Sequence, residues 1–134
     1  MGASDWTVFF SSAEVLVDAY ESPPPLSECT IVYAQIDERD ASLTLSCETS
    51  VLPSNPPAEW AGTDYNTVEF FLKFSGVADL RISGWDWTVR DAEIALSRCA
   101  EGVRVSVVSA SSRLDLVAAQ ACVLRMRSYL AARE

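Results

Sequence analysis

The sequence contains no histidine among its 134 residues. Histidine is the commonest general base of enzymes, so its absence excludes serine–histidine and cysteine–histidine nucleophile pairs. The four cysteines form no C-x-x-C pair, and a zinc site would need four thiolates to converge from separate segments. We therefore expect neither a metal site nor a cofactor, and we interpret the cysteines as small buried thiols in a reducing cytoplasm. They are Cys29, Cys47, Cys99 and Cys122.

Long hydrophobic runs are also missing, because no apolar stretch approaches the roughly 20 residues that span a bilayer. The opening segment "MGASDWTVFF" carries an acid where a secretory signal would carry basic residues. We therefore expect the protein to stay in the cytoplasm. The composition, 49 % hydrophobic and 22 % charged, is that of an ordinary globular protein, and the length fits a single domain over residues 1–134.

Basic residues are scarce in the first half of the chain. The formal net charge is −9; residues 1–69 hold twelve acids and one base, Arg39, whereas residues 70–134 hold seven acids and nine bases. An acidic half repels phosphate groups and anionic lipid, so we expect neither nucleic acid nor a membrane as a direct partner. A basic protein is the partner that this charge favours. The alternative is that acidity only keeps a small protein soluble.

One helix is predicted near the start of the chain. Ser11 stands three residues before Glu14, which is the spacing of a capping box, and Leu16, Ala19 and Tyr20 then share one helical face. The helix must end before the run of three prolines that follows, because each proline removes a backbone donor.

After the prolines the apolar period changes to two, which is typical of half-buried strands. Residues 29–37 and 42–48 are two such runs, joined by the charged turn "ERDA", and they predict a hairpin. Residues 92–99 and 103–110 predict a second hairpin, in whose turn Gly102 can take a positive backbone angle. The sheet is therefore expected to be mostly antiparallel.

A further strand is predicted over residues 67–74. Glu69 and Lys73 lie on the face opposite to four apolar residues, and Phe71 is an exception on that outer face, which leaves room for a dimer. The four residues of the inner face are Val68, Phe70, Leu72 and Phe74.

The strand pattern continues after a Ser75–Gly76 turn. Leu80 and Ile82 are expected to extend the inner face over residues 77–84, while Arg81 points outward.

Residues 113–130 fit either period. Alanine content favours a helix, whereas the preceding hairpins favour a strand that bends near Ala118–Ala119, and we predict the strand. The expected fold class is α+β and mostly β: an antiparallel sheet, sandwich-like or half-barrel, of about seven strands with one N-terminal helix.

Tryptophans mark two irregular segments. Residues 51–66 contain three prolines, yet Trp60 and a tyrosine are too apolar for a free linker, so we expect the aromatic rings to pin this loop. Trp85 follows Gly84, where a bulge would reverse the strand alternation, and the usual burial of tryptophan favours a structural role. Trp87 is equally suited to the core and to ligand contact.

Three segments follow one another along the chain: the proline-rich "NPPAEW", the alternating "NTVEFFLKFSGVADLRISGW" and, near the end, "RMRSYL". Together with "PPPLSECTIVYAQIDERDASLTLSCE" upstream, residues 5–130 resemble the immunity protein 50 family of bacterial polymorphic toxin systems. The resemblance implies a small cytoplasmic, mostly β protein that is encoded beside a toxin gene and neutralises that toxin by binding. The most family-like residues are Pro57, Trp60, Asn66, Val68, Phe74, Leu80, Gly84 and Trp85.

The acidic turn "DERD" and Trp87 are features that we do not expect throughout the family. They are therefore candidates for contact with this protein's own partner. We predict occlusion of a basic toxin by an acidic surface, and charge alone suggests a nuclease. The sheet face around Glu69 and Phe71 is an alternative contact surface. The predicted contact residues are Asp37, Glu38, Asp40, Glu59, Asp64 and Trp87.

Catalysis would require a pair of carboxylates, such as Asp86 with Asp91 or Asp37 with Asp40. Acids this close in an acidic chain are usually parts of solvated turns, so we expect no enzyme and no catalytic residue.

A carbohydrate-binding β module is the alternative function, with Trp60, Trp85 and Trp87 as a platform for sugar rings. The missing export signal and the acidic bias argue against it. A structural accessory domain without a dedicated ligand is a third interpretation.

Overall fold

The computed structural model describes residues 6–86 and 90–132. In these residues, eight strands form two four-stranded antiparallel sheets, accompanied by one α-helix and three short 3-10 helices. None of these helices has the length and hydrophobicity needed to cross a bilayer. The helices are η2 (Trp6–Phe9), α1 (Glu14–Ala19), η3 (Leu26–Glu28) and η4 (Ala58–Trp60). The strands are β1 (Thr30–Asp37), β2 (Ser42–Thr49), β3 (Thr67–Ser75), β4 (Ala78–Ser83), β5 (Glu93–Cys99), β6 (Gly102–Val108), β7 (Arg113–Ala118) and β8 (Gln120–Tyr129).

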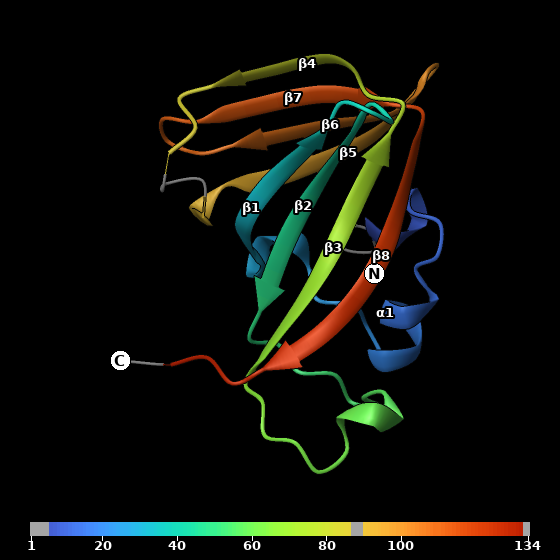
Figure 1. Ribbon diagram of the computed structural model, residues 1–134, viewed down its shortest axis with the longest axis vertical. Coiled ribbons are helices and arrows are strands. Elements are labelled where there is room, and N and C mark those ends of the chain that lie inside the picture. Colours follow the sequence, from blue (N-terminus) through green and yellow to red (C-terminus); the bar gives the residue numbers. More distant parts are fainter. Residues whose placement is uncertain (1–5, 87–89, 133–134) are drawn as a thin grey trace.

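Sheet A has the strand order β1-β2-β3-β8, and sheet B has the order β4-β7-β6-β5 (Figure 1). Both predicted hairpins, β1–β2 and β5–β6, are present as antiparallel pairs. The predicted mostly β fold with one N-terminal α-helix is confirmed, and the strand count rises to eight because residues 113–129 form two strands.

Two segments of the chain pass between the sheets at a shared corner. β3 pairs with β8 in sheet A, while their neighbours in sequence, β4 and β7, pair in sheet B. At the corner, the N–H of Ala119 donates to the carbonyls of Ser75 (2.9 Å) and Gly76 (3.3 Å). Gly76 has φ +64°, and a Cβ there would lie only 2.9 Å from the Cβ of Ala119, so this close approach favours glycine. The predicted bend near Ala118–Ala119 is therefore confirmed, and the helical alternative is wrong.

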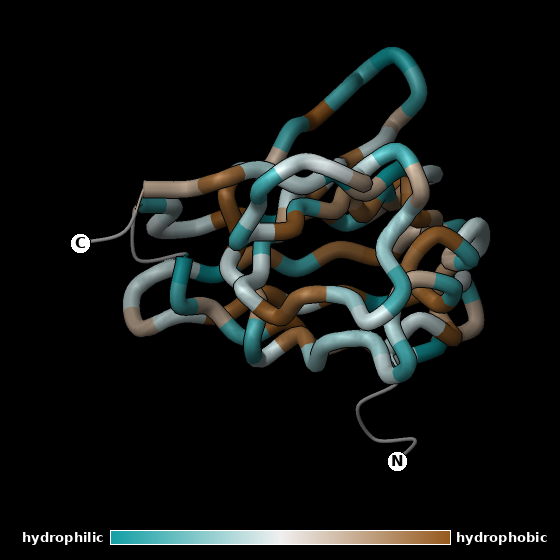
Figure 2. Tube along the Cα trace, turned by 90° about the horizontal axis from the view of Figure 1, so that it is seen from below, coloured by the Kyte–Doolittle hydropathy of each residue, from teal (hydrophilic) through white to brown (hydrophobic). Residues whose placement is uncertain are grey.

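The core joins the inner face of sheet A to buried residues of β6 and β7 in sheet B. All four residues predicted for the inner face of β3 are fully buried. The N-terminal segment covers them, because the ring of Trp6 stacks on Phe70 with centroids 5.5 Å apart and Phe10 contacts Phe74 at 5.6 Å. Figure 2 shows hydrophobic segments through the interior of the trace and hydrophilic loops at its periphery. The outer face of sheet A is left without a covering helix or strand among the described residues.

The predicted capping box is wrong. The helix begins at Glu14 after Ala13, and no side chain caps its first turn. Ser11 instead extends the edge of β8: its N–H donates to the carbonyl of Ala121 (2.9 Å), and its carbonyl accepts from the N–H of Val123 (3.0 Å). A long-range backbone pairing therefore takes the residue that local spacing assigned to the cap. The buried face of α1 is as predicted.

Ile82 lies on the inner face of its strand, as predicted, but at the open edge of sheet B. Ile82 does pair with the buried Leu114, but it is 43 % exposed, because β4 is the edge of sheet B. Leu80 is half-buried and packs against the core, as the alternation predicts.

Candidate functional site

The acidic β1–β2 turn is partly neutralised by its own neighbours. Asp37 accepts two hydrogen bonds from the guanidinium of Arg39, each 3.0 Å long, and these bonds lower its pKa. Asp40 accepts from the hydroxyl of Ser42 (2.6 Å) and pairs with Lys73 (3.0 Å), and both contacts lower the pKa of Asp40. Glu38 is exposed and has no ion pair with any described residue. It is therefore the carboxylate of the turn best able to attract a cation.

A second group of acids lies at the opposite end of sheet A. The loop of residues 51–66 packs against the end of α1, where the backbone N–H of Asn55 donates to the carbonyl of Ala19 (2.9 Å). Residues 11–29 and 50–66 hold six acids and no base. All six are exposed, and none forms an ion pair within residues 6–86 and 90–132. We call this group the acidic end; it consists of Glu14, Asp18, Glu21, Glu28, Glu59 and Asp64.

The structure does not bring the predicted contact residues into one cluster. Asp37, Glu38 and Asp40 lie at one end of β2, and Glu59 and Asp64 follow its other end (Figure 1). The eight residues of β2 separate the two groups by about 25 Å at roughly 3.3 Å per residue. Both groups border the outer face of sheet A. The predicted contact at position 87 lies outside the described residues.

A polar network fills the centre of that outer face, and sequence reasoning missed it. Glu69 accepts hydrogen bonds from Ser46 and from the guanidinium of Arg127, the latter at 2.6 Å. Beside them, the hydroxyl of Tyr129 donates to Glu48, and Glu48 pairs with Arg90 at 3.6 Å. Burial raises the pKa of Tyr129 to about 12, and the hydrogen bond to Glu48 adds to the effect. A possible sequence signal was the alternation of "RMRSY", which places Arg127 and Tyr129 on one face.

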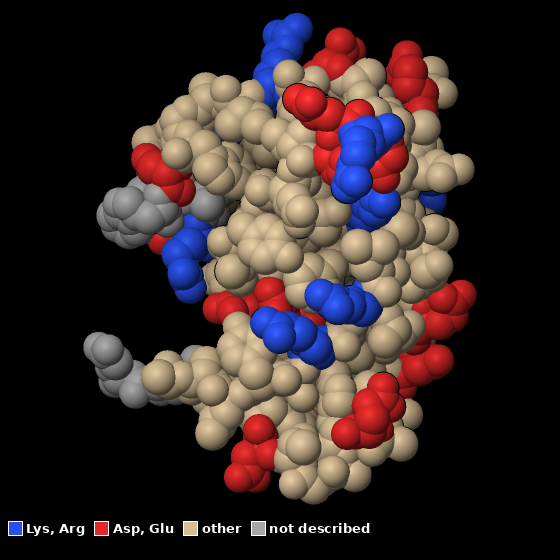
Figure 3. Space-filling view, viewed as in Figure 1, with Lys and Arg blue, Asp and Glu red and all other residues tan. Residues whose placement is uncertain are grey.

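Phe71 lies on this outer face, as predicted, but neighbouring side chains cover it. Its ring is only 4 % exposed because the guanidinium of Arg125 lies over it, 4.8 Å from the centroid, and Tyr33 contacts it from β1. Long side chains from both edge strands thus cover the centre of the sheet. Little of Phe71 is therefore exposed for contact with a second copy of the chain. Figure 3 shows the face, with basic side chains near its centre and acidic ones towards both ends.

The loop of residues 51–66 is held by side-chain and backbone contacts. Trp60 is buried at 9 % exposure and packs edge-on against Tyr65, with centroids 5.3 Å apart. The backbone N–H of Trp60 donates to the carbonyl of Pro57 (3.0 Å). Asn66 ties the loop to the end of the chain by donating to the carbonyl of Ala131 (3.0 Å) and accepting from its N–H (2.8 Å). The buried ring of Trp60 is therefore not available to a sugar platform.

Gly84 and Trp85 lie at the end of β4. Gly84 has φ +62°, and a Cβ there would stand 2.0 Å from the carbonyl oxygen of Ser111, so only glycine fits without backbone movement. Trp85 is half-buried and packs against the core. Both residues thus have structural contacts in this fold.

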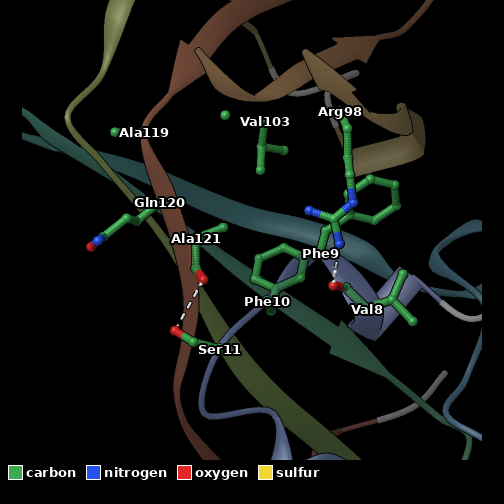
Figure 4. A pocket seen from close by; sticks show the side chains of 10 residues that line it. Val8, Phe9, Phe10, Ser11, Arg98, Val103, Ala119, Gln120 and Ala121 are labelled. Atoms are coloured by element: carbon green, nitrogen blue, oxygen red, sulfur yellow. Dashed lines mark hydrogen bonds between the residues drawn. The ribbon is translucent and has the colours of Figure 1, made fainter. Parts of the chain in front are cut away.

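A pocket of about 430 Å³ opens where η2 meets β5, β6 and the corner of β8 (Figure 4). Its charged residue is Arg98, which donates to the carbonyl of Val8 (2.8 Å) and lies 5.1 Å from the ring centroid of Phe9. No carboxylate or thiol lines it, so this pocket offers no acid–base pair. Its lining residues are Val8, Phe9, Phe10, Ser11, Arg98, Gly102, Val103, Ala119, Gln120 and Ala121.

The described residues contain no group of cysteines and carboxylates suited to a metal ion. All four cysteines are free; Cys29 and Cys47 are buried as expected, whereas Cys99 and Cys122 are half-buried. Asp86 is one of the carboxylates considered above for catalysis. It accepts hydrogen bonds from the hydroxyls of Ser111 and Ser112.

Comparison with known proteins gives one informative result. No curated protein and no solved structure shows a significant match. The family model of immunity protein 50 matches residues 12–129, which include both sheets, α1 and the loop held by Trp60. The chain therefore belongs to the immunity protein 50 family.

Proposed function

We propose that this protein is a cytoplasmic immunity protein that binds a cognate toxin of a polymorphic toxin system and neutralises it by covering the toxin's active site. Family membership supports the immunity role. The toxin is basic, and a nuclease, whose groove must attract phosphate, is the class that charge favours. The protein acts by binding and contributes no catalytic residue.

The observation that carries the charge argument is the acidic end. Its six carboxylates are exposed and have no ion pair among the described residues, so their charge extends into solvent. Complementary charge of this kind raises the association rate of a basic partner and lowers it for an acidic one. The effect should weaken as salt is added, because exposed charges are screened over about 8–10 Å at physiological ionic strength.

The outer face of sheet A is the surface that we assign to close contact. A standard interface buries about 800 Å² per partner, a patch about 30 Å across, which is enough to reach from the acidic turn to Asp64. The centre of this face presents Tyr33, Arg125 and Arg127, and tyrosine and arginine are enriched among residues that dominate binding energy. Arg127 is already held by Glu69, so less conformational entropy is lost on binding.

Growth rescue is the first experiment. The toxin encoded by the adjacent gene is expressed in a sensitive host with and without this protein, and the two proteins are then tested for co-purification. Restored growth with a stable complex is the expected result. A toxic neighbour that is neither rescued nor bound would exclude this pair, and binding of glycans by the tryptophans would be tested next.

Charge reversal tests the surface. Glu59→Lys with Asp64→Lys should raise Kd and weaken its dependence on salt, because two carboxylates of the acidic end are reversed. Asp91→Lys with Glu93→Lys, at the start of β5 in sheet B, changes the net charge equally and is the matched control. Equal effects of the two double variants would show that only net charge matters and would reject the acidic end as the toxin-facing region.

A further inference from the structure

Each sheet has two edge strands, and three of the four are partly covered or distorted (Figure 1). In sheet A, the backbone of Ser11 pairs with β8. In sheet B, β5 contacts η2 and η3, and β4 has an irregular register between Ala78 and Arg81. Features of this kind keep an edge from pairing with another chain. The fourth edge strand, β1, pairs with β2 and forms no backbone hydrogen bond to any other described segment.

β1 also lacks the residue types that usually protect an edge. Residues 29–36 include no charged residue and no proline. A bulge between Ile31 and Tyr33 disturbs the start of the strand and leaves residues 33–37 in regular register with β2. In an antiparallel ladder, successive residues direct their backbone groups alternately to one side and to the other. Every second residue of 33–37 therefore turns its N–H and carbonyl towards the open edge, where a further strand can bind them.

An apolar pocket of about 260 Å³ lies on the inner side of this edge, between the β1–β2 hairpin and the start of β4. Ile36 pairs with Leu43 in the register, and both side chains line the pocket with Val77 and Leu80. Leu43 is fully buried, whereas Ile36 is 51 % exposed, so the pocket leads from the core to the surface. Opposed residues on neighbouring strands have Cβ atoms about 5 Å apart. An apolar side chain on a strand added beside Ile36 would therefore reach this pocket.

Charge decides between a strand of the toxin and a second copy of this chain as the partner of β1. Glu28 and Glu38 flank the strand, and both are exposed and form no ion pair within the described residues. Residues 1–69, which include β1 and β2, hold twelve acids and one base. Two copies joined through β1 would therefore bring two strongly negative surfaces together. A basic segment instead meets opposite charge at both ends of the strand.

We propose that the cognate toxin adds a strand of its own to β1 as a fifth strand of sheet A, with an apolar side chain in the pocket beside Ile36 and basic residues near Glu28 and Glu38. This inference rests on the proposed function and names the mode of binding. In such strand addition, the backbone hydrogen bonds supply affinity and the side chains at alternate positions supply selectivity. The added strand continues the outer face of sheet A, so one toxin contacts the edge and that face together.

Amide hydrogen exchange, measured by NMR on the free protein and on the saturated toxin complex, tests the pairing directly. Within residues 33–37, the amides that face the edge exchange quickly in the free protein, whereas those that bond β2 are protected. Binding should slow the edge-facing amides about tenfold or more, because each gains a carbonyl partner. The amides of β4, an edge strand of the other sheet, are the control and should keep their rates. Unchanged exchange at the edge-facing amides of β1 would overturn the proposal.

Substitution of Ile36 tests the apolar contact. Ile36→Glu should raise Kd about tenfold, although the added negative charge by itself favours a basic toxin. Ile82→Glu is the matched control: Ile82 is an inner-face isoleucine of an edge strand, 43 % exposed, and does not line the pocket, so Kd should not rise. Ile36→Ala is a milder variant that should raise Kd about threefold. Urea denaturation of each variant checks that it folds.

Removal of the flanking charges tests the basic ends of the toxin strand. Glu28→Gln with Glu38→Gln should raise Kd about threefold and weaken its dependence on salt. Glu93→Gln with Glu101→Gln is the control, because these exposed acids flank the edge strand β5 in the same way and the net charge changes equally.

The outcomes separate this inference from the function on which it rests. If the wild-type protein does not bind the toxin, the proposed function fails. If it binds, but the β1 amides stay unprotected and the Ile36 variants match Ile82→Glu, the proposed function stands and the edge assignment is overturned. Protection of β1 that increases with protein concentration in the absence of toxin, together with a dimer in analytical ultracentrifugation, would assign the edge to a second copy and would also overturn the proposal.

Discussion

Glu69 and Arg127 form an ion pair on the outer face of sheet A, with Nε and Oε1 2.6 Å apart. The side chain of Glu69 is 5 % exposed, whereas that of Arg127 is 59 % exposed. The pair joins β3 to β8 at directly opposed positions. A carboxylate this deeply covered needs its partners, since an unpaired buried charge is costly. The contact therefore both stabilises the sheet and fixes the position of an arginine that we assign to toxin contact.

A double-mutant cycle measures this coupling. Arg127→Ala should lower the free energy of unfolding by about 1.5–3 kcal/mol, the range for hydrogen bonds to charged groups. In the Glu69→Ala background the same change should cost much less. The Asp37–Arg39 pair, whose side chains are 34 % and 90 % exposed, should give a smaller coupling energy by the same method. Equal coupling in the two pairs would contradict the assigned role of burial.

The fold was predictable where a local pattern agreed with the tertiary structure. Every second residue of β3 is apolar and fully buried, so the period of two was sufficient to assign its inner face. It was insufficient for Ile82, because no local signal shows that β4 is an edge strand. The capping box failed for a similar reason: the backbone of Ser11 pairs with β8, which lies more than a hundred residues away in the sequence.

The candidate site was less predictable, because its contacts are long-range. The acids of the β1–β2 turn are visible in the sequence, but their partial neutralisation by Lys73 depends on the register of β2 against β3. The Glu69–Arg127 pair joins residues 58 positions apart. Composition showed that the first half of the chain is acidic, whereas only the structure shows which carboxylates have no ion pair among the described residues.

Two glycines with positive φ provide a test of backbone geometry. Gly84→Ala should destabilise the protein by about 1–3 kcal/mol from φ alone, and by more because its Cβ would meet the carbonyl oxygen of Ser111 at 2.0 Å. Gly62→Ala is the control, since its φ is +82° but nothing lies within 4 Å of the added Cβ. Chemical denaturation of both variants should show the larger loss for Gly84→Ala. A larger loss for Gly62→Ala would contradict the described close approach.

Thiol reactivity should divide the cysteines into two pairs. Burial raises the pKa of Cys29 to about 12 and raises the pKa of Cys47 as well, so at pH 8 neither thiol forms the reactive thiolate. Cys99 and Cys122 are half-buried and more accessible. Titration of the native protein with Ellman's reagent should therefore label no more than two thiols, and denaturant should release the others. The variant with both Cys99→Ser and Cys122→Ser should not react until it unfolds; rapid labelling of that native variant would contradict the assignment.

Because the pKa of Tyr129 is raised in the folded protein, we predict a loss of stability at high pH. Its pKa is about 12 in the folded protein, mainly because of burial, and about 10 in an unfolded chain. A group with a raised pKa contributes its full stability below its unfolded pKa and loses it as pH rises through its folded pKa, so this contribution should disappear between pH 10 and 12.

Tyr129→Phe removes both the titrating group and the hydrogen bond to Glu48. The variant should be less stable than the wild type at pH 9, and the difference in free energy of unfolding, measured by urea denaturation, should narrow as pH rises to 12. A difference that stays constant over this range would show that Tyr129 titrates alike in the folded and unfolded chain.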